Sequence, residues 1–287
     1  MKSLHDIAAP AKLNLFLHVT GRRSDGYHLL QSVFMLIDWY DTLHFELRAG
    51  GQISREDLGA ALPADDLVLR AARALKAAAG SELGVHIAID KRIPAQAGMG
   101  GGSSDAASTL LALNRLWKLG LSLEQLGRIG LRLGADVPFF LGGKNAWVEG
   151  VGEQLTPITV PAGRFLVVKP DQGIDTGRIF SDPSLKRDSE AAIISGFFAD
   201  PFGFGRNDLQ SVAERLCPGV TQALEWLAAR GLRGRMTGSG SAVFAPVLKH
   251  LDLGSVPGGF QVRFCNGLAA HPLLGWATGN SLSVDSF

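Results

Sequence analysis

The chain has 287 residues, of which 46% are hydrophobic and 19% are charged, and its formal net charge is +1 at pH 7. The length supports one large domain or two ordinary domains with real cores, and the composition excludes a disordered chain. Because the charge is close to zero, we expect neither nucleic acid nor a membrane surface as the main partner.

The first half of the chain opens with strands. Alternating apolar residues predict strands over Leu13–Val19, Leu29–Ile37 and Leu43–Leu47, the first two joined by a turn at Gly21–Gly26. Lys12 and Asn14 lie two residues apart and should share a face of the first strand. Residues 49–63 are expected to form an irregular connection.

Helices and further strands follow. One predicted helix opens with the capping box Ser122–Gln125 and ends at Gly134. The other helical patterns cover Asp66–Ala79, Val137–Leu141, Ser189–Phe198, Asn207–Leu216 and Thr221–Arg230. Strands are predicted over Val85–Ile89 and Arg164–Lys169, and residues 170–184 read as a loop-rich crossing. The early strands come mostly as hairpins, so we expect an α+β fold and not a doubly wound parallel sheet. We expect two domains, over residues 1–155 and 156–287.

The run Gly98-Met99-Gly100-Gly101-Gly102-Ser103-Ser104 is the strongest local signal. Glycine permits positive φ and close approach of a ligand to the backbone, and successive free N–H groups form a concavity that binds anions. A helix is predicted behind it, with Ser103 or Ser104 as N-cap, and its N-terminus adds unpaired N–H groups. The pattern predicts a phosphate site, and Asp105 must then point away from the phosphate.

Two familiar phosphate loops are excluded here. The P-loop needs a Lys followed by Ser or Thr after its last glycine, but Gly102 is followed by Ser103. The dinucleotide fingerprint would need glycine where Ser103 stands. On this loop alone, a flexible glycine-rich turn without a ligand stays open as an alternative.

The rest of the composition points to an ordinary cytoplasmic protein. Cys217 and Cys265 form no CxxC pair, so neither a disulfide framework nor a zinc site is expected. No apolar leader is visible at the N-terminus, and no run of about 18 apolar residues predicts a membrane span. We expect a monomer or a weak homodimer in the cytoplasm.

Five motifs stand together in one order. They are Pro10-Ala11-Lys12-Leu13-Asn14-Leu15-Phe16-Leu17, Asp25-Gly26-Tyr27-His28, the glycine loop with its approach from Pro94, Gly134-Ala135-Asp136-Val137-Pro138-Phe139-Phe140, and Thr237-Gly238-Ser239-Gly240-Ser241. Over roughly residues 7–247 this set resembles the GHMP kinases. Gly-Tyr-His and Gly-Ala-Asp-Val-Pro-Phe-Phe are typical of the branch that acts on a cytidine-diphosphate-linked methylerythritol. Residues 275–287 carry no matching motif.

The resemblance implies a two-domain fold of hairpin-rich sheets covered by helices, with the active-site cleft between the domains. It implies ATP-dependent phosphorylation of the 2-hydroxyl of that substrate, in non-mevalonate isoprenoid biosynthesis. The catalytic residues would be Lys12 and Asp136, and Asn14, Tyr27, His28 and Phe180 would bind the acceptor substrate. The residues that would bind ATP are Pro94, Ala95, Gln96, Ala97, Gly98, Met99, Gly100, Gly101, Gly102, Ser103 and Ser104.

One position departs from the pattern. The family often has an Asn-Leu pair at the start of the first helix, with the Asn near adenine, whereas this chain has Asp66-Leu67. The departure concerns the nucleobase contact and not the phosphate chemistry. Mg²⁺ is expected, held mainly by phosphates and water, because no carboxylate cage is visible, and the hydroxyl of Ser103 or Ser104 could add a ligand.

Each residue has a plainer explanation when it is taken alone. Asp136 could be a helix N-cap, Lys12 a solvated lysine, and Phe180 simple packing. Tyr27 could be a half-buried sheet aromatic, and His28 an ordinary surface or core histidine. The occurrence of all of them in one order favours the functional interpretation.

Two other functions are considered. One is another small-molecule kinase of the same superfamily, of the homoserine or mevalonate type, and Gly26-Tyr27-His28 argues against it. The other is a non-catalytic nucleotide-binding regulator, and the presence of both Lys12 and Asp136 argues against that. Nucleic-acid binding through Arg22 and Arg23 does not fit the net charge.

Overall fold

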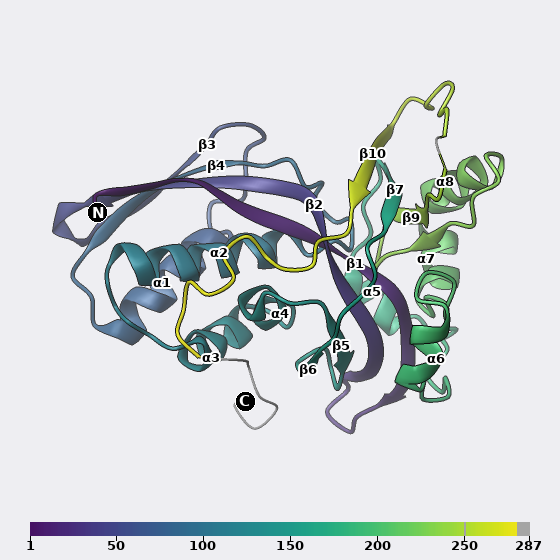
Figure 1. Cartoon of the computed structure of the whole chain (residues 1–287), viewed down its shortest axis with the longest axis horizontal. Coiled ribbons are helices and arrows are strands. Elements are labelled where there is room, and N and C mark those ends of the chain that lie inside the picture. The colour runs from purple at the N-terminus through teal and green to yellow at the C-terminus, as the bar shows by residue number, and fades with distance from the viewer. Residues whose placement is uncertain (250, 280–287) are drawn as a thin grey trace.

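Two long antiparallel strands run the length of the molecule (Figure 1). They are β1 (Ser3–Arg22) and β2 (His28–Arg48), in a computed structural model that describes residues 1–249 and 251–279. The separate strand predicted over Leu43–Leu47 is wrong, because those residues continue β2. The pairing of β1 with β2 shifts in register between the two predicted segments, where Pro10 pairs with Tyr40 and Ala11 with Ile37.

The first sheet has the order β3-β4-β2-β5-β6, with β1 paired to β2. Its other strands are β3 (Ile53–Asp57), β4 (Gly84–Asp90), β5 (Ala146–Glu149) and β6 (Gln154–Pro157). Only β3 and β4 pair in parallel among these strands. The expected irregular run 49–63 therefore contains β3 and a 3₁₀ turn at Ala49–Gly51. β3 is a polar edge strand, so it lacks the apolar alternation that would have predicted it.

Four helices cover one face of this sheet (Figure 1). They are α1 (Leu67–Ala79), α2 (Gly101–Leu116), α3 (Leu123–Leu133) and α4 (Val137–Gly142). The predicted capping box of α3 is confirmed, since Ser122 and Gln125 bond each other's backbone N–H reciprocally. The N-cap predicted for α2 is wrong: α2 begins after Gly100, whose φ is 71°, because positive φ there turns the glycine loop directly into the helix.

The second sheet has the order β10-β7-β9-β8. Its strands are β7 (Arg164–Pro170), β8 (Arg235–Met236), β9 (Val243–Pro246) and β10 (Phe260–Asn266), and the helices beside it are α5 (Thr176–Ser181), α6 (Ile194–Ala199), α7 (Gln210–Leu216) and α8 (Pro218–Ala228). Three predicted boundaries shift, because α6 and α7 begin later than expected and α8 begins at Pro218. Proline suits a first turn, where its missing N–H leaves no bond unmade.

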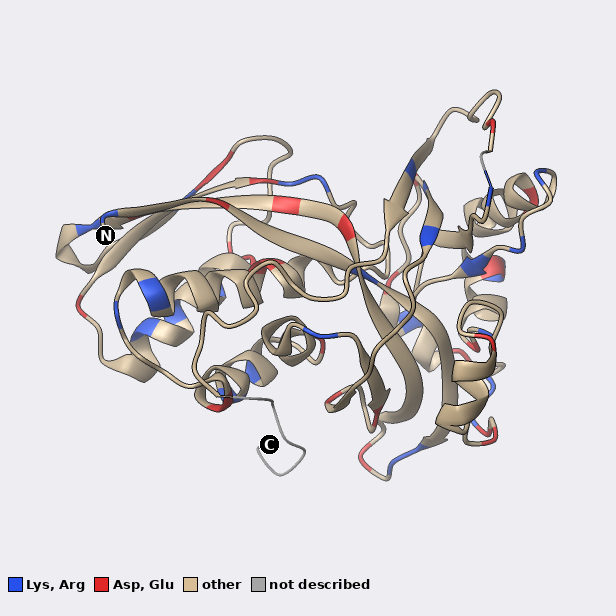
Figure 2. Cartoon of the chain, viewed as in Figure 1, with Lys and Arg blue, Asp and Glu red and all other residues tan. Residues whose placement is uncertain are grey.

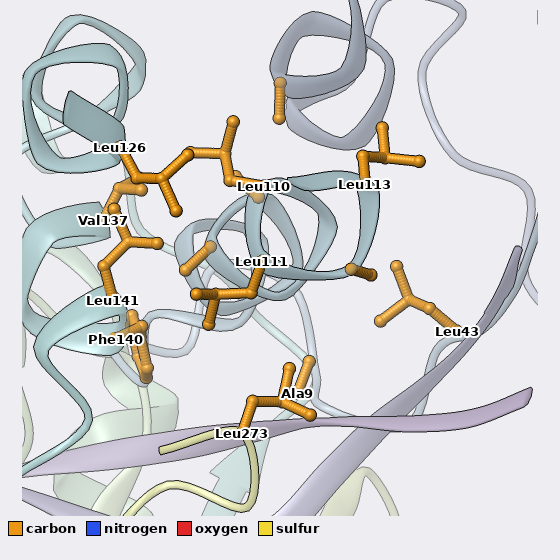
Figure 3. Packing of buried hydrophobic residues seen from close by; sticks show 14 of the residues in the cluster. Ala9, Leu43, Leu110, Leu111, Leu113, Leu126, Val137, Phe140, Leu141 and Leu273 are labelled. Atoms are coloured by element: carbon orange, nitrogen blue, oxygen red, sulfur yellow. The ribbon is translucent and has the colours of Figure 1, made fainter. Parts of the chain in front are cut away.

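The core around α2 fixes the position of α4 (Figure 3). Leu110 and Leu111 of α2 are buried and belong to one cluster with Leu126 of α3 and with Val137 and Leu141 of α4. The same cluster includes residues of both long strands. Because α2 follows the glycine loop and α4 follows Asp136, this packing holds two parts of the predicted site in a fixed relation.

The segment after β10 returns to the first sheet. The backbone N–H of Leu268 donates to the carbonyl of Leu36 at 2.8 Å, and that of Leu123 donates to the carbonyl of Thr278 at 2.8 Å. Leu273 is buried in the same cluster and lies beside Ala9 of β1 (Figure 3). Of the stretch from 275 that carried no motif, residues 280–287 lie outside the described residues.

Charged residues are spread over both halves, with the two signs interspersed (Figure 2). Cys217 and Cys265 are buried free thiols. Among the helices of residues 1–249 and 251–279, none is long and apolar enough to span a bilayer.

Candidate active site

A cavity of about 710 Å³ lies where the two halves of the chain meet. Its walls come from β1, β2, the start of α1, the segment after β4, the start of α2, and two loops of the second half. Of the predicted site residues, those that line it are Lys12, Asn14, Pro94 to Ser103, Asp136 and Phe180. Tyr27, His28 and Ser104 are not among the lining residues.

The glycine loop ends in free backbone donors. The N–H of Ser104 bonds to the carbonyl of Gly100 at 2.9 Å, so the N–H groups of Gly101, Gly102 and Ser103 precede the first intrahelical bond of α2. These three residues line the cavity. The N-terminus of this 16-residue helix therefore offers an anion both unpaired donors and a positive dipole end.

The loop Thr237–Ser241 packs against the glycine loop. A Cβ on Gly98, whose φ is 71°, would lie 2.1 Å from the carbonyl oxygen of Thr237, and a Cβ on Gly238 would lie 2.6 Å from the carbonyl oxygen of Gly98. The N–H of Ser241 also donates to the carbonyl of Gln96 at 3.0 Å. These contacts support the glycine loop, and Gly238, Ser239 and Gly240 of the late element also line the cavity.

Lys12 and Asn14 share a face of β1, as predicted. Lys12 is 3% exposed, and its Nζ donates to Oδ1 of Asn14 at 2.5 Å and lies 3.5 Å from Oδ2 of Asp136. Its Nζ also lies 4.4 Å from the centroid of the Phe34 ring. Burial lowers the pKa of Lys12 below its ordinary value, and the attraction of Asp136 offsets this only in part.

Asp136 stands at the N-cap position of α4, but its side chain makes no capping bond there. The side chain is 29% exposed and faces both Lys12 and the cavity. Asp136 is therefore not a plain helix cap. Pro138 in the first turn and the packing of α4 hold this carboxylate in place.

Asp105 is held away from the anion site by Lys91. The Nζ of Lys91 lies 2.5 Å from Oδ2 of Asp105 and also bonds Asp41, and both carboxylates are buried. Burial would lower the pKa of Lys91, but Asp105 and Asp41 more than offset it, so the net shift is upward. Asp41 also accepts the backbone N–H groups of Arg92 and Ile93, at 2.6 and 2.8 Å.

We call Lys91, Asp41 and Asp105 the acid–lysine clamp. It joins β2, the approach to the glycine loop and α2 in one buried cluster, so it fixes where the loop starts and where its helix starts. Sequence reasoning missed the clamp. The one available signal was Asp41, a carboxylate inside an otherwise strand-like apolar run, because such a residue needs a partner when it is buried.

The position that departs from the family pattern caps α1. Oδ1 of Asp66 accepts the N–H of Leu69 at 3.1 Å and lies 2.6 Å from Nη1 of Arg55. Arg55 also donates to the carbonyls of Pro63 and Leu62, at 3.1 and 3.3 Å. Asp66 thus orders the loop before α1, which forms one wall of the cavity.

Of the three residues predicted to meet a pyrimidine, Phe180 lines the cavity and His28 packs beside it, whereas Tyr27 is an exposed residue next to His28 in the sequence. The rings of His28 and Phe180 stand 5.0 Å apart, tilted by 32°, and Phe180 lines the cavity. Tyr27 is 64% exposed and lies in the turn before β2. Ser104 is fully buried beneath the glycine loop, and its hydroxyl has no hydrogen-bond partner in the described part of the chain.

Among residues 1–249 and 251–279, no three His, Cys, Asp or Glu side chains gather where they could hold a metal ion. The oxygens that line the cavity close to the α2 N-terminus include the hydroxyl of Ser103 and the carboxylate of Asp136.

Comparisons with known proteins agree with this arrangement. The model of the GHMP kinases N-terminal domain matches residues 66–144, and that of the GHMP kinases C-terminal region matches residues 196–254. A protein of Albidiferax ferrireducens named 4-diphosphocytidyl-2-C-methyl-D-erythritol kinase is 76% identical over 286 residues, covering 100% of both chains. One of the same name from Variovorax paradoxus is 63% identical, covering 97% of this chain and 100% of that one.

A solved structure, the crystal structure of 4-(cytidine 5'-diphospho)-2C-methyl-D-erythritol kinase, superposes with a TM-score of 0.74 at 36% identity. The match covers 84% of this chain and 89% of that one. The chain therefore belongs to the GHMP kinase family, among its 4-diphosphocytidyl-2-C-methyl-D-erythritol kinases.

Proposed function

We propose that this chain transfers the γ-phosphoryl group of ATP to the 2-hydroxyl of 4-diphosphocytidyl-2-C-methyl-D-erythritol. The observation that carries the proposal is the Lys12–Asp136 pair, 3.5 Å apart and open to a cavity whose other wall is the N-terminus of α2. An acid–base pair beside an anion site is what phosphoryl transfer to an alcohol requires. The names of the relatives supply the acceptor.

The glycine loop holds the nucleotide in this mechanism. The free N–H groups at the start of α2 bind phosphate oxygens, and the helix dipole favours their negative charge. The acid–lysine clamp keeps the carboxylate of Asp105 away from these phosphates. The loop therefore binds the anion through backbone groups alone, without a lysine of the P-loop kind.

Asp136 accepts the proton of the attacking hydroxyl. The hydroxyl oxygen forms a bond to the γ-phosphorus while the bond from that phosphorus to the bridging oxygen breaks, and ADP leaves with the bond's electron pair. An alcohol is a weak acid, so the proton moves late, and an ordinary carboxylate suffices. Lys12 stabilises charge on the acceptor oxygen and the moving phosphoryl group, because its ammonium is preorganised and mostly desolvated.

Mg²⁺ fits this site as an ion held mainly by ATP and water. It takes oxygen ligands and keeps several waters, so one or two protein oxygens suffice, and the hydroxyl of Ser103, which lines the cavity, would supply one. When bound, the ion screens the charge of the β- and γ-phosphates. Asp41 and Oδ2 of Asp105 bond Lys91, so neither residue is assigned as a ligand here.

The cytidylyl group would occupy the end of the site near Tyr27, His28 and Phe180. Stacking of one base on an aromatic side chain contributes roughly 1–3 kcal/mol. Asn14 would contact the acceptor end, where its amide lies between Lys12 and Ser32.

A coupled ADP-release assay tests the function. The cytidylyl substrate should be turned over with ATP, while homoserine and mevalonate should give rates at the background of the assay. Absence of ADP release with every acceptor would favour a nucleotide-binding regulator instead. Tyr27→Ala should raise KM for the cytidylyl substrate by roughly 5- to 100-fold and leave KM for ATP nearly unchanged. Equal damage to both KM values would contradict the position assigned to Tyr27.

A further inference from the structure

A single arginine joins the two sides of the proposed pyrimidine end. Arg187 follows α5, and its Nε donates to Nε2 of His28 at 2.9 Å. Its terminal nitrogens donate to the carbonyls of Leu185, Phe180 and Asp182, at 3.0, 3.1 and 2.8 Å. The guanidinium thus connects the helix that carries Phe180 to the first residue of β2, although these lie about 150 residues apart in the sequence.

This contact fixes the proton on the imidazole. A guanidinium has five donors and no acceptor, and it keeps its charge in proteins, so Nε2 of His28 must offer a lone pair. The ring proton of the neutral imidazole is then on Nδ1. Burial, then Arg187, then Arg22 lower the pKa of His28, which favours the neutral ring.

The Nδ1–H donor is left for a ligand. In the described part of the chain, Nδ1 of His28 makes no hydrogen bond. It is not one of the fully buried polar atoms that lack a partner, so it keeps some accessible surface. The ring stands 5.0 Å from that of Phe180, which lines the cavity. A base stacked at this aromatic end would therefore have a directed donor beside its edge.

We infer that Arg187 is a positioning residue that sets base selectivity, by holding His28 as an Nδ1–H donor for a pyrimidine with an acceptor at N3. The inference rests on the proposed cytidylyl function. Cytosine has an unprotonated N3, whereas uracil has N3–H, which would set donor against donor. A buried donor left unpaired in this way lowers affinity by roughly ten- to a hundredfold.

The chain offers a matched pair of variants. Arg187→Gln and Arg187→Glu place a nitrogen or an oxygen at the same bond distance from the backbone as Nε of arginine. Both lose the contacts to the three carbonyls equally, so loss of those contacts cancels in the comparison. Glutamine can still donate to Nε2 of His28, whereas the carboxylate of glutamate accepts from it and moves the ring proton to Nε2, which makes Nδ1 an acceptor.

The first readout is the tautomer itself. Long-range ¹H–¹⁵N spectra of the free full-length protein at pH 8.5 should show the Nδ1–H pattern for His28 in the wild type and in Arg187→Gln, and the Nε2–H pattern in Arg187→Glu. The His28 signal is assigned from its loss in His28→Gln. An Nε2–H pattern in the wild type would overturn the inference, and this readout does not depend on turnover.

The second readout is selectivity, measured as kcat/KM for the cytidylyl substrate relative to its uridylyl analogue. The ratio should be maintained in Arg187→Gln and fall by roughly ten- to a hundredfold in Arg187→Glu. Equal ratios in the two variants, with wild-type enzyme active on the cytidylyl substrate, would overturn the inference and leave the proposed function standing. A wild-type protein inactive on both substrates would instead count against the proposed function, and the spectra would still decide the tautomer.

Discussion

Two lysines flank the glycine loop, Lys12 buried and Lys91 largely buried, and they differ in their carboxylate partners. Lys12 has a single carboxylate partner, Asp136, at 3.5 Å, and that partner is 29% exposed. Lys91 has two carboxylate partners, Asp41 and Asp105, and both are buried. Burial acts on both ammonium groups, yet the pKa of Lys12 is lowered and that of Lys91 is raised.

The difference separates a reactive group from a structural one. The charge of Lys91 is shared between two carboxylates, so this lysine holds the elements on either side of the glycine loop together, although it also lines the cavity. The charge of Lys12 is only partly balanced, so new negative charge arriving in the cavity stabilises it and is stabilised by it. The same residue type thus has two roles that follow from the number of acids around it.

The largest effect should come from removing the carboxylate of Asp136 beside Lys12. Asp136→Asn should lower kcat by about 10²- to 10⁴-fold, because the amide accepts no proton from the acceptor hydroxyl. The coupled ADP assay gives kcat, and titration calorimetry should show ATP affinity within a few-fold of wild type. Near-normal turnover would remove Asp136 from the role of base.

The same substitution should affect stability differently at the two lysines. Lys91→Met leaves two buried carboxylates without a cation and should lower the free energy of unfolding by about 3–5 kcal/mol. Lys12→Met removes a desolvated ammonium beside a partly exposed acid, so the free energy of unfolding should stay constant or rise. Urea unfolding at pH 7 measures both values.

Asp105→Asn is the matched control for the clamp. It leaves Lys91 paired with Asp41 alone and should cost less than Lys91→Met. If Lys91→Met were as stable as wild type, the clamp would not be a structural element and the comparison would fail.

Gly98→Ala tests whether the acid–lysine clamp alone holds the glycine loop in position, or whether the close contact between Gly98 and Thr237 is also needed. The new methyl group would meet the carbonyl of Thr237 at a φ of 71°, so we expect a loss of about 1–3 kcal/mol and a raised KM for ATP. Gly231→Ala, also at a φ of 71° but with open space around it, isolates the backbone strain. Equal losses in the two variants would mean that contact with Thr237 does not position the loop.

The smallest effect is a shift along the pH axis. Because the pKa of Lys12 is lowered from 10.5, kcat should fall on the alkaline side below pH 10.5, as the ammonium loses its proton. Lys12→Arg should move that fall to higher pH, since a guanidinium stays charged, whatever its absolute rate. A pH profile of kcat for both enzymes checks this, and coincident alkaline limbs would assign the fall to another group.

The pKa of Lys91 is shifted upward, opposite to that of Lys12, and this shift makes the stability of the folded protein depend on pH. The pKa of Lys91 is raised in the folded protein, so its contribution is fully present below the unfolded value of 10.5 and is lost as pH rises through the folded value above it. Wild type should therefore lose stability over that range more steeply than Lys91→Met. Parallel curves of unfolding free energy against pH would contradict the assignment.

Sequence patterns predicted the parts of the site that depend on local chemistry. The placement of Lys12 and Asn14 on one face followed from strand periodicity, and the short helix after Asp136 followed from Pro138. The N-cap of α2 was misplaced because two serines obscured the turn made by Gly100. The continuation of β2 was missed because a bulge in a paired strand resembles a break.

Contacts between residues that lie far apart in the sequence could not be predicted from local patterns. Lys91 meets Asp41 across 50 residues, and Arg187 meets His28 across 159. Each partner alone looks like an ordinary surface charge or an isolated polar residue in a strand. Only the fold shows that these charges are shared, because pairing depends on which strands and loops are neighbours in space.

The β1–β2 hairpin has a consequence for how substrates enter. Its inward-facing residues contribute to all three hydrophobic clusters, with Ile7 in the first, Phe16 in the second and Val19 in the third. Rigid-body separation of the two halves would have to bend paired strands and open these clusters at once. The two halves are thus held together by continuous paired strands. We therefore expect nucleotide and acceptor to enter the cavity through movement of surface loops and not through a hinge motion of the two halves.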